Sequence, residues 1–382
     1  MAALSEAAPV RVVSEAPPAR IAVLGAGWWS QGWHLPDLKN HPGAVIAAIV
    51  DPNPEPRSAI PPALVSLARL SQTYECPTFP SLEALLASDV EVDGVICCTS
   101  HASHSELGAA ALRAGKHVLM EKPMTTDVAQ AAALARAARD APQLYFAVNN
   151  TASWRPQALR AAEWVRGGRV GAVEHVLVAF HSPLLWLFDD PANTGWTTST
   201  GSMLGNGFAW GQMSHPLAWV FQVTGLEAVA CSCTMTRSPN SGADLTNAAT
   251  FECRGGATIS ISGAATLPGN AHGDEVVGKH VSLRVFGSEG VLTYDGDDAD
   301  EASGRLALSR RDGTHDECPG FLFENFVQGA TGPESLQAFV AACRGLPHTR
   351  AIGADLGAAV VNAIDAMYRS DAQRGARVSV AE

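Results

Sequence analysis

A short apolar segment that ends in two closely spaced glycines restricts the fold of this chain more than any other feature. IAVLGAG occupies residues 21–27, and AVIAAIVD, residues 44–51, is a second apolar run that ends in an acidic residue. DGVICCTS (93–100) and HVLMEKP (117–123) repeat the pattern. Apolar runs of this length that end in turn-forming residues are typical of parallel strands buried on both faces of a sheet.

Alanine- and leucine-rich segments with helix-forming patterns lie between these runs. In SLEALLASD (81–89), Ser81 is placed to cap a helix, and HSELGAAALRAGK (104–116) ends near a glycine suited to close one. Alternating strands and helices predict an α/β fold with a doubly wound parallel sheet. We expect this domain to span residues 20–148, after a flexible N-terminal segment, residues 1–19, that is rich in Ala, Pro, Ser and Glu.

The second part of the chain, residues 149–382, is expected to form a sheet-based domain. VEHVLVAFHS (173–182), NAATFECRGGATISISG (247–263) and VSLRVFGSEGVLTYD (281–295) alternate or run as long β segments with Gly and Asp turns. ADLGAAVVNAIDAMYRS (354–370) carries apolar residues at helical spacing. We expect this last helix to tether the two domains.

Charge, apolar content and cysteine spacing exclude several classes of function. The chain carries 26 Lys and Arg against 38 Asp and Glu, a net charge of −12, which is the wrong sign for binding nucleic acid. No stretch reaches the roughly 18 apolar residues of a membrane span, and the opening residues lack the apolar core of a signal peptide, so we expect a cytoplasmic protein. None of the 8 cysteines has the CxxC spacing of a zinc site. Cys231 and Cys233 fit one face of a strand as reduced thiols.

The glycine turn indicates a dinucleotide site. Gly25 and Gly27 meet the first two positions of the pattern GxGxxG, while Ser30 stands at the third. Gly25 permits a tight turn, Gly27 lets backbone amides approach a pyrophosphate, and the helix that follows offers its positive end. Asp51, 26 residues after Gly25, suits the hydroxyls of the adenosine ribose and repels a 2′-phosphate, which favours NAD over NADP. Arg57 is the nearest cation that could offset this repulsion.

Several short sequences in a fixed order resemble the Gfo/Idh/MocA oxidoreductases, the family of glucose-fructose oxidoreductase and inositol dehydrogenase. They are IAVLGAG, HLP (34–36), the segment from DGVICCTS to HVLMEKPM (93–124), RGGRVGAVEHV (166–176) and ADLGAAVVNAIDAMYRSDAQRGARVSV (354–380). The resemblance implies a Rossmann domain followed by an α+β domain with an open, predominantly antiparallel mixed sheet. It implies that the open face of this sheet forms the substrate site and often an oligomer contact. It also implies chemistry on sugars, inositols or related polyols, and a homo-oligomer such as a dimer or tetramer.

The resemblance assigns a set of residues to the cofactor. Glu121 of the EKP sequence would contact the nicotinamide ribose, and Pro123 would shape the turn, with a cis peptide expected before it. The family's loop over the cofactor more often has Pro and Asn at the positions of Ser100 and His101. The expected cofactor-binding residues are Gly25, Gly27, Trp28, Trp29, Asp51, Thr99, Ser100, His101, His104, Glu121, Lys122 and Asn149. No metal site is expected at the histidines of this loop, His101 and His104.

Lys122 and His215 are the catalytic pair that the resemblance implies. Lys122 would reach the substrate hydroxyl, and His215 matches the family's catalytic histidine in a glycine-rich turn and helix. The acid that usually stands four residues before this histidine is Gly211 here, and the acid often found three residues after it is Ala218. Positions four apart share a helix face, so the usual acidic partner of the histidine is missing.

The remaining substrate contacts are less specific. Besides Lys122 and His215, the expected substrate-binding residues are Trp154, Arg155 and Asn206, and Asn206 or Gln212 could assist the histidine. Trp186, Trp196 and Trp210 also lie in segments expected near the cleft, where sugars stack readily on indole faces, but core packing is an equal alternative for each. Thr197 follows Trp196 where relatives often have arginine, so an anionic substrate is not specifically indicated.

Together these features predict an NAD-dependent oxidoreductase that oxidises a secondary hydroxyl of a sugar, cyclitol or glycoside. His215 would accept the hydroxyl proton and Lys122 would stabilise the developing alkoxide during hydride transfer to nicotinamide. One alternative is a redox-neutral enzyme that retains NAD and oxidises its substrate transiently to permit elimination, epimerisation or glycosidic cleavage. The other is a non-catalytic NAD-binding regulatory protein, which the loss of both family acids would allow.

Overall fold

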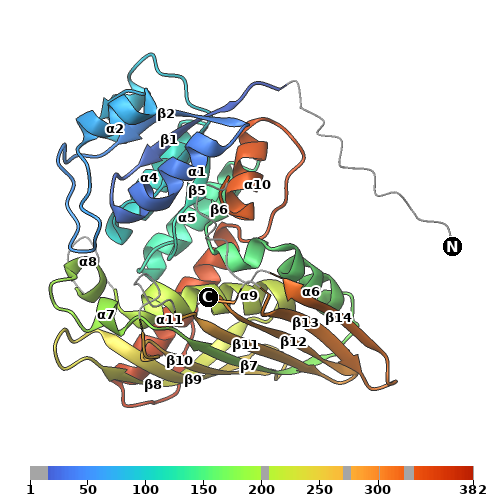
Figure 1. Ribbon diagram of the computed structural model, residues 1–382. Helices are drawn as coiled ribbons and strands as arrows, with labels where there is room; N and C mark the ends of the chain where they lie inside the picture. The colour runs from blue at the N-terminus through green and yellow to red at the C-terminus, as the bar shows by residue number, and fades with distance from the viewer. Residues whose placement is uncertain (1–15, 199–205, 270–276, 301, 322–330, 382) are drawn as a thin grey trace.

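The computed structural model of the protein describes residues 16–198, 206–269, 277–300, 302–321 and 331–381. These residues form two β-sheets with helices between and around them (Figure 1). The first sheet and its helices occupy the upper part of Figure 1, and the second, larger sheet lies below them.

The first sheet has six parallel strands in the order β3-β2-β1-β4-β5-β6. It is the doubly wound sheet that the alternating apolar runs and helices predicted. Its strands are β1 (Ala19–Leu24), β2 (Ala44–Val50), β3 (Thr78–Phe79), β4 (Gly94–Cys97), β5 (His117–Met120) and β6 (Phe146–Val148). Its helices are α1 (Leu35–Asn40), which follows a π-helical turn (Ser30–His34), α2 (Leu67–Tyr74), α3 (Leu82–Leu86), α4 (His101–Arg113) and α5 (Val128–Asp140).

Helix capping and a close backbone approach explain two of the local sequence patterns in this domain. The Ser81 hydroxyl accepts a hydrogen bond from the backbone N–H of Ala84 over 3.2 Å and so caps α3, as predicted. Gly25 has a φ of +94°, and a Cβ here would lie 2.3 Å from the carbonyl oxygen of Cys98, just after β4. Glycine is therefore required where the chain leaves β1 beside β4.

The second sheet has nine strands in the order β14-β13-β12-β11-β7-β10-β9-β8-β15. Only β7 and β10 pair in parallel, so the predicted mixed, mainly antiparallel sheet is confirmed. The strands are β7 (Val173–His181), β8 (Ala228–Arg237), β9 (Asp244–Cys253), β10 (Thr258–Ala264), β11 (His280–Gly287), β12 (Gly290–Asp297), β13 (Gly304–Arg310), β14 (His315–Phe321) and β15 (Val378–Ser379). The helical segments after β6 are a 3₁₀ turn (Thr151–Trp154), α6 (Pro156–Arg166), α7 (Leu185–Phe188), α8 (Thr194–Thr197), a π-helical turn (Ala209–Met213), α9 (Ser214–Thr224), α10 (Glu334–Cys343) and α11 (Ala354–Ala372).

Helices cover one face of the second sheet. On β8, Cys231 and Cys233 are both buried as reduced thiols, as predicted. Helix α11 packs against β8, and both cysteine side chains are almost fully buried, so they face the helical side. On β7, by contrast, Leu177 is 43 % exposed and points away from the helices. No helix in the described part of the chain is long and apolar enough to span a membrane.

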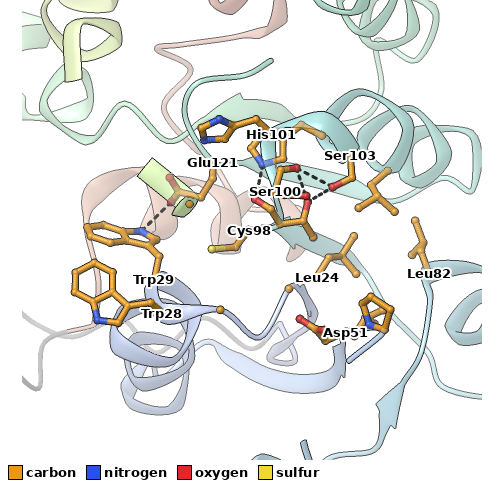
Figure 2. A pocket seen from close by; sticks show the side chains of 18 of the residues that line it. Leu24, Trp28, Trp29, Asp51, Leu82, Cys98, Ser100, His101, Ser103 and Glu121 are labelled. Carbon is orange, nitrogen blue, oxygen red and sulfur yellow. Dashed lines mark hydrogen bonds between the residues drawn. The ribbon is translucent and has the colours of Figure 1, made fainter. Parts of the chain in front are cut away.

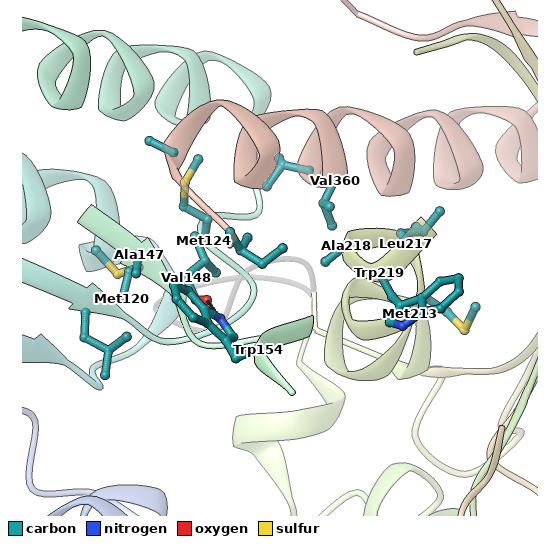
Figure 3. Packing of buried hydrophobic residues seen from close by; sticks show 14 of the residues in the cluster. Met120, Met124, Ala147, Val148, Trp154, Met213, Leu217, Ala218, Trp219 and Val360 are labelled. Atoms are coloured by element: carbon teal, nitrogen blue, oxygen red, sulfur yellow. Dashed lines mark hydrogen bonds between the residues drawn. The ribbon is translucent and has the colours of Figure 1, made fainter. Parts of the chain in front are cut away.

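The C-terminal helices return to the first domain. Helix α10 packs against β1 and β5 of the first sheet, although it follows the strands β7 to β14 in the sequence. Helix α11 packs against α5 on one side and against β8 and α9 on the other. Figure 3 shows Val360 of α11 above Met124 and Val148 of the first domain and beside Ala218 of α9. One apolar core therefore joins the two domains beneath α11.

Gly94→Ala is expected to destabilise the fold by about 1 to 3 kcal/mol, because an added methyl group would overpack the contact between β4 and α10. A Cβ at Gly94 would lie 2.6 Å from Sγ of Cys343 and 2.8 Å from Cζ of Phe339. Gly32→Ala is the matched control, since a Cβ there meets no atom within 4 Å. Urea denaturation measures the free energy of unfolding of each variant, and equal values for both variants would contradict this packing.

Candidate functional site

A cavity of about 740 Å³ opens at the carboxyl ends of β1, β2, β4 and β5. Open α/β sheets bind ligands in the crevice at this edge. Figure 2 shows Trp28 and Trp29 of the glycine turn, His101 at the start of α4, and Asp51 after β2 around this space. Of the twelve expected cofactor-binding residues, only Asn149 does not line it.

The glycine turn leaves room for a ligand beside the backbone. A Cβ at Gly27 would meet no atom within 4 Å, so the backbone here borders open space in the cavity. The carboxylate of Asp51 accepts hydrogen bonds from the backbone N–H groups of Ala26 and Asn53, each over 2.8 Å. These bonds fix the acidic group next to the glycine turn, where the adenosine ribose of a dinucleotide is expected. Arg57 lines the same cavity.

The loop between β4 and α4 is fixed by its own side chains. The Ser103 hydroxyl donates to Oγ1 of Thr99 over 2.8 Å. The ring of His104 lies between the backbone carbonyls of Thr99 and Pro123, 3.1 Å from each, and burial lowers its pKa. His104 therefore fastens the loop to the turn after β5, and both of its ring nitrogens already face protein partners.

His101, at the first position of α4, carries a buried polar atom that the protein does not satisfy. Its Nδ1 has no hydrogen-bond partner among the residues that the structure describes. Burial lowers its pKa to about 3, and the positive charges of His104 and Lys122 act in the same direction. The ring is therefore neutral at physiological pH. An unsatisfied nitrogen in this wall, together with the glycine turn and Asp51, fits a dinucleotide that brings polar groups of its own.

Glu121, just after β5, is held by four hydrogen bonds. Its Oε1 accepts from Trp29 Nε1 (3.1 Å), His34 Nε2 (2.8 Å) and Asn149 Nδ2 (2.7 Å). Its Oε2 accepts from the backbone N–H of Lys122 over 3.1 Å. Burial alone would raise the pKa of this carboxyl, but the hydrogen bond and charge of His34, with Lys122 and Asn149, lower it to about 2. Glu121 is therefore a permanent anion.

Asn149, expected at the cofactor, instead connects Glu121 to α10. Its amide oxygen accepts a hydrogen bond from the hydroxyl of Ser335 over 2.5 Å, while its amide nitrogen donates to Glu121. It borders a second cavity on the other side of Glu121. Both polar atoms of its side chain are thus engaged in hydrogen bonds within the protein.

The second cavity, of about 70 Å³, brings together Lys122 and His215 and shares part of its wall with the first. Lys122 stands in the turn after β5, and the peptide to Pro123 is cis, as expected. His215 lies in the first turn of α9, in the second domain. Burial, and then the positive charges of Lys122 and Lys279, lower the pKa of His215 well below its ordinary value. His215 is therefore a neutral base at physiological pH.

Gly211 stands where the family resemblance places an acid. The Lys122 ammonium group donates to the carbonyl oxygen of Gly211 over 3.0 Å and lies 5.8 Å from the centre of the Trp196 ring. A Cβ on Gly211 would lie 3.1 Å from Cζ of Phe188 and 3.7 Å from Cζ3 of Trp196. These two rings fill the space that a carboxylate would need. Ala218, the other departure from the family, lies in the core (Figure 3).

Three expected substrate-binding residues lie outside both cavities. Trp154 is 2 % exposed and packs in the core beneath α11 (Figure 3), with its indole N–H donated to a backbone carbonyl. Arg155 is buried at the start of α6. The side-chain amide of Asn206 donates to the carbonyl of Gly195 in α8, so it supports the turn that carries Trp196. In this structure all three are buried, and Trp154 and Asn206 donate hydrogen bonds within the protein.

Of the other tryptophans, Trp186 and Trp196 line the second cavity, whereas Trp210 is buried and stacks on Tyr368. The cavity also includes Lys279, which the sequence did not single out and which pairs with Asp298 at 3.3 Å. No local pattern marks this lysine, because the folding of distant strands brings it to the site.

His34 was also missed, although it is the first residue of the HLP sequence. Its imidazole binds Glu121, a residue 87 positions away, and only the resemblance of that short sequence could have drawn attention to it. No group of three or more metal-binding side chains occurs within the described ranges.

The second cavity does not lie on the open face of the second sheet, contrary to the expectation from the family. Its lining residues after residue 148 are Asn149 and Thr151, residues of the segment 184–196, Gln212 and His215 around the start of α9, and Lys279. Helices α7, α8 and α9 lie on the side of the sheet that faces the first domain (Figure 1). The candidate site is therefore a cleft between the domains.

Two family descriptions match consecutive parts of the chain. "Oxidoreductase family, NAD-binding Rossmann fold" matches residues 19–149, and "GFO/IDH/MocA C-terminal domain" matches residues 158–293. A solved structure of levoglucosan dehydrogenase in complex with NADH has a TM-score of 0.73 to this chain, at 17% identity over 96% of this chain and 100% of that one. That structure has a similar fold.

Curated relatives match shorter stretches. UDP-N-acetylglucosamine 3-dehydrogenase of Acidithiobacillus ferrooxidans is 33% identical over 109 residues, which are 28% of this chain and 32% of the relative. D-xylose 1-dehydrogenase (NADP(+)) of Hypocrea jecorina is 28% identical over 163 residues, which are 41% of this chain and 40% of the relative. The chain thus matches less than half the length of either relative.

His101→Asn is expected to make stability less sensitive to acid. With a pKa of about 3, His101 stays neutral in the folded chain, whereas the unfolded chain binds a proton at this residue below about pH 6.5. Stability therefore falls as the pH decreases from 7 to 5, and His101 contributes about 2 kcal/mol to that fall.

Urea denaturation at both pH values measures this difference in the wild type and in His101→Asn. His315→Asn is the control, because His315 is exposed and its loss leaves the buried histidines unchanged. An equal loss of stability on acidification in the wild type and in His101→Asn would contradict the conclusion that His101 is neutral in the folded chain.

Proposed function

The chain belongs to the Gfo/Idh/MocA oxidoreductases, and we propose that it oxidises a secondary hydroxyl of a sugar, cyclitol or glycoside with NAD. The proposal rests on one observation: Lys122 from the first domain and His215 from the second line the same cavity, beside the cavity of the glycine turn. NAD, when bound, supplies the nicotinamide ring that accepts a hydride.

Lys122 and His215 have different roles at the substrate oxygen. The neutral ring of His215 accepts the proton of the hydroxyl group. The ammonium group of Lys122 stabilises the negative charge that develops on that oxygen. Its position is restricted by the carbonyl of Gly211 and the ring of Trp196, which supports a directed role for this cation. Because the two groups belong to different domains, the packing between the domains sets the distance between them.

A sugar or related polyol is the substrate class that the site and the relatives support best. The relatives above are named for action on UDP-N-acetylglucosamine and on D-xylose. In this chain, Trp186 and Trp196 present indole rings to the cavity that holds Lys122 and His215. Indole faces suit the C–H faces of sugar rings.

NAD is the cofactor we propose, in preference to NADP. Asp51 carries a negative charge beside the glycine turn, where a 2′-phosphate would be repelled. We therefore expect a higher affinity for NAD than for NADP, although Arg57 lines the same cavity and one relative is named for NADP(+).

We propose in addition a homo-oligomer that uses the face of the second sheet not covered by helices. Leu177, near the middle of β7, is 43 % exposed on this face. Burying such apolar surface between two copies would be favourable.

Lys122→Met and His215→Asn are each expected to lower kcat/KM about 100-fold or more, because each removes one of the two groups that act on the substrate oxygen. The formation of reduced nicotinamide is followed by its absorbance, with a panel of inositols, sugars and glycosides. Lys116→Met is the matched control, since Lys116 lies next to the opposite end of β5. NADH affinity, followed by energy transfer from tryptophan, should stay within about threefold of the wild type in His215→Asn and Lys116→Met.

Turnover that stays within about twofold of the wild type in Lys122→Met or His215→Asn would contradict these roles. Product formed without reduced nicotinamide would instead indicate the redox-neutral alternative, so product mixtures are also examined by mass spectrometry.

Asp51→Asn is expected to raise the ratio of kcat/KM with NADP to kcat/KM with NAD about tenfold, by removing a repulsion of about 1.4 kcal/mol. Asparagine keeps one oxygen that can accept the hydrogen bond from Ala26. Asp89→Asn, at an exposed position before β4, is the control. An unchanged ratio would mean that Asp51 does not select the cofactor.

A further inference from the structure

A hydrogen-bonded pair outside both cavities supports the turn that precedes His215. The pair consists of Asp244, the first residue of β9, and Tyr368 on α11. The hydroxyl of Tyr368 donates to Oδ1 of Asp244 over 2.6 Å, and Asp244 is 1 % exposed. Neither residue lines either cavity, so neither is placed to touch a ligand in them.

The other carboxylate oxygen of Asp244 binds the backbone of this turn. Its Oδ2 accepts a hydrogen bond from the backbone N–H of Ala209 over 2.8 Å. Ala209 begins the π-helical turn that continues into α9, and the first N–H groups of a helix have no carbonyl partner within it. The carboxylate therefore caps the turn, although Asp244 lies 35 positions later in the chain.

Gly207 lets the pair approach the backbone of the turn. A Cβ at Gly207 would overlap Oδ1 of Asp244 and lie 3.1 Å from the hydroxyl of Tyr368. The carbonyl of Gly207 accepts a hydrogen bond from the backbone N–H of Gly211 over 2.8 Å. The pair thus packs directly against the residue that binds the peptide of Gly211.

The ring of Tyr368 adds an aromatic contact to the same turn. It stacks on Trp210, with 5.7 Å between ring centroids and 12° between planes. This contact and the hydrogen bond to Ala209 hold two consecutive residues of the turn. Because Tyr368 belongs to α11, which also packs against α5 of the first domain, the turn is connected to both domains.

The turn and the start of α9 supply several groups of the candidate site. The carbonyl oxygen of Gly211 accepts a hydrogen bond from the Lys122 ammonium group over 3.0 Å, and Gln212 and His215 line the small cavity. Gly211 has no side chain that could orient His215, so the backbone of the turn determines where the imidazole lies. A small displacement of a reacting group can cost a large part of the rate.

We propose that Asp244 and Tyr368 are positioning residues, which fix the turn before α9 and thereby the place of His215 relative to Lys122. The hydrogen bond between the pair keeps the carboxylate aimed at the backbone of the turn, and the turn carries the carbonyl that holds the Lys122 ammonium group. The inference rests on the proposed function, because it takes His215 as the base. The pair itself exchanges no proton with the substrate.

Tyr368→Phe tests the inference, because it removes only the hydroxyl and keeps the ring that stacks on Trp210. The assay uses NAD and the compound of the inositol, sugar and glycoside panel with the highest kcat/KM. We expect kcat to fall about tenfold, because His215 is displaced from its productive position. KM and the affinity for NADH should stay within about threefold of the wild type.

Tyr145→Phe is the matched control. Tyr145 is 1 % exposed, and its hydroxyl donates to the carbonyl of Thr349 over 2.9 Å. Each of the two variants therefore loses one hydroxyl that donates a hydrogen bond inside the protein, and thermal unfolding compares the effect on stability. Because Tyr145 lines neither cavity and does not contact the turn, its variant should keep kcat within about twofold.

Asp244→Asn is the second variant, because an amide leaves one oxygen for the two donors that the carboxylate now binds. We expect it to lower kcat about tenfold or more. The double variant with Tyr368→Phe should lose no more than about twice what Asp244→Asn loses alone, since both residues act through one hydrogen bond. If Asp244→Asn does not fold, Tyr368→Phe carries the test.

The imidazole signals of His215 provide a readout that needs neither substrate nor cofactor. They are recorded by nuclear magnetic resonance on protein labelled with nitrogen-15 at histidine, and they are identified by their loss in His215→Asn. We expect these signals to shift in Tyr368→Phe, because the imidazole moves relative to Lys122. They should keep their wild-type positions in Tyr145→Phe.

Failure of the inference is distinguishable from failure of the proposed function. Unshifted His215 signals in Tyr368→Phe, or a kcat that falls equally in Tyr368→Phe and Tyr145→Phe, would overturn the inference and leave the proposed function standing. An unchanged kcat in Tyr368→Phe would also overturn it. Shifted His215 signals in a protein that turns over no compound of the panel would support the positioning of His215 and count against the oxidation chemistry.

Discussion

The buried carboxylate of Glu121 is the interaction on which the arrangement of the site depends. Removing a carboxylate from water is costly unless hydrogen bonds and opposite charge compensate for the loss. Trp29, His34 and Asn149 all donate to one of its oxygens. These donors come from the segment after β1 and from the end of β6, so a single anion holds the ends of three strands together. Through Asn149, the hydroxyl of Ser335 adds α10 to the same network.

The apolar core beneath α11 then determines how the two halves of the site meet. A Cβ on Gly357 of α11 would lie 2.8 Å from the sulfur of Met124, so the helix passes very close to the segment that follows Lys122. On its other side α11 packs against α9, which begins with the turn that carries His215. Close packing of this kind resists small displacements. The spacing of the two polar groups is thus maintained by apolar contacts outside the site.

Local sequence patterns predicted the helices and strands. Long-range packing, by contrast, determines which of the expected site residues reach a cavity and which are buried. The parallel sheet, the cap at Ser81 and the glycine turn at Gly25 follow from short-range rules, because each depends on neighbours in the sequence or on one adjacent strand. The burial of Trp154 could not be predicted, because its turn packs against α9 and α10, which come much later in the sequence. The exclusion of an acid at Gly211 depends in the same way on Phe188 and Trp196, whose positions are set by the folded second domain.

Glycine at position 211 leaves the Lys122 ammonium group without a carboxylate from this position. In this chain the ammonium group meets the carbonyl oxygen of Gly211 and the ring of Trp196 instead. Its positive charge helps to keep His215 neutral, since burial and then Lys122 lower the pKa of that ring. Under the proposed chemistry, further negative charge develops beside Lys122 as the hydroxyl loses its proton to His215. The attraction is therefore stronger in the transition state than in the ground state, which is the condition under which the pair accelerates the reaction without the family's acid.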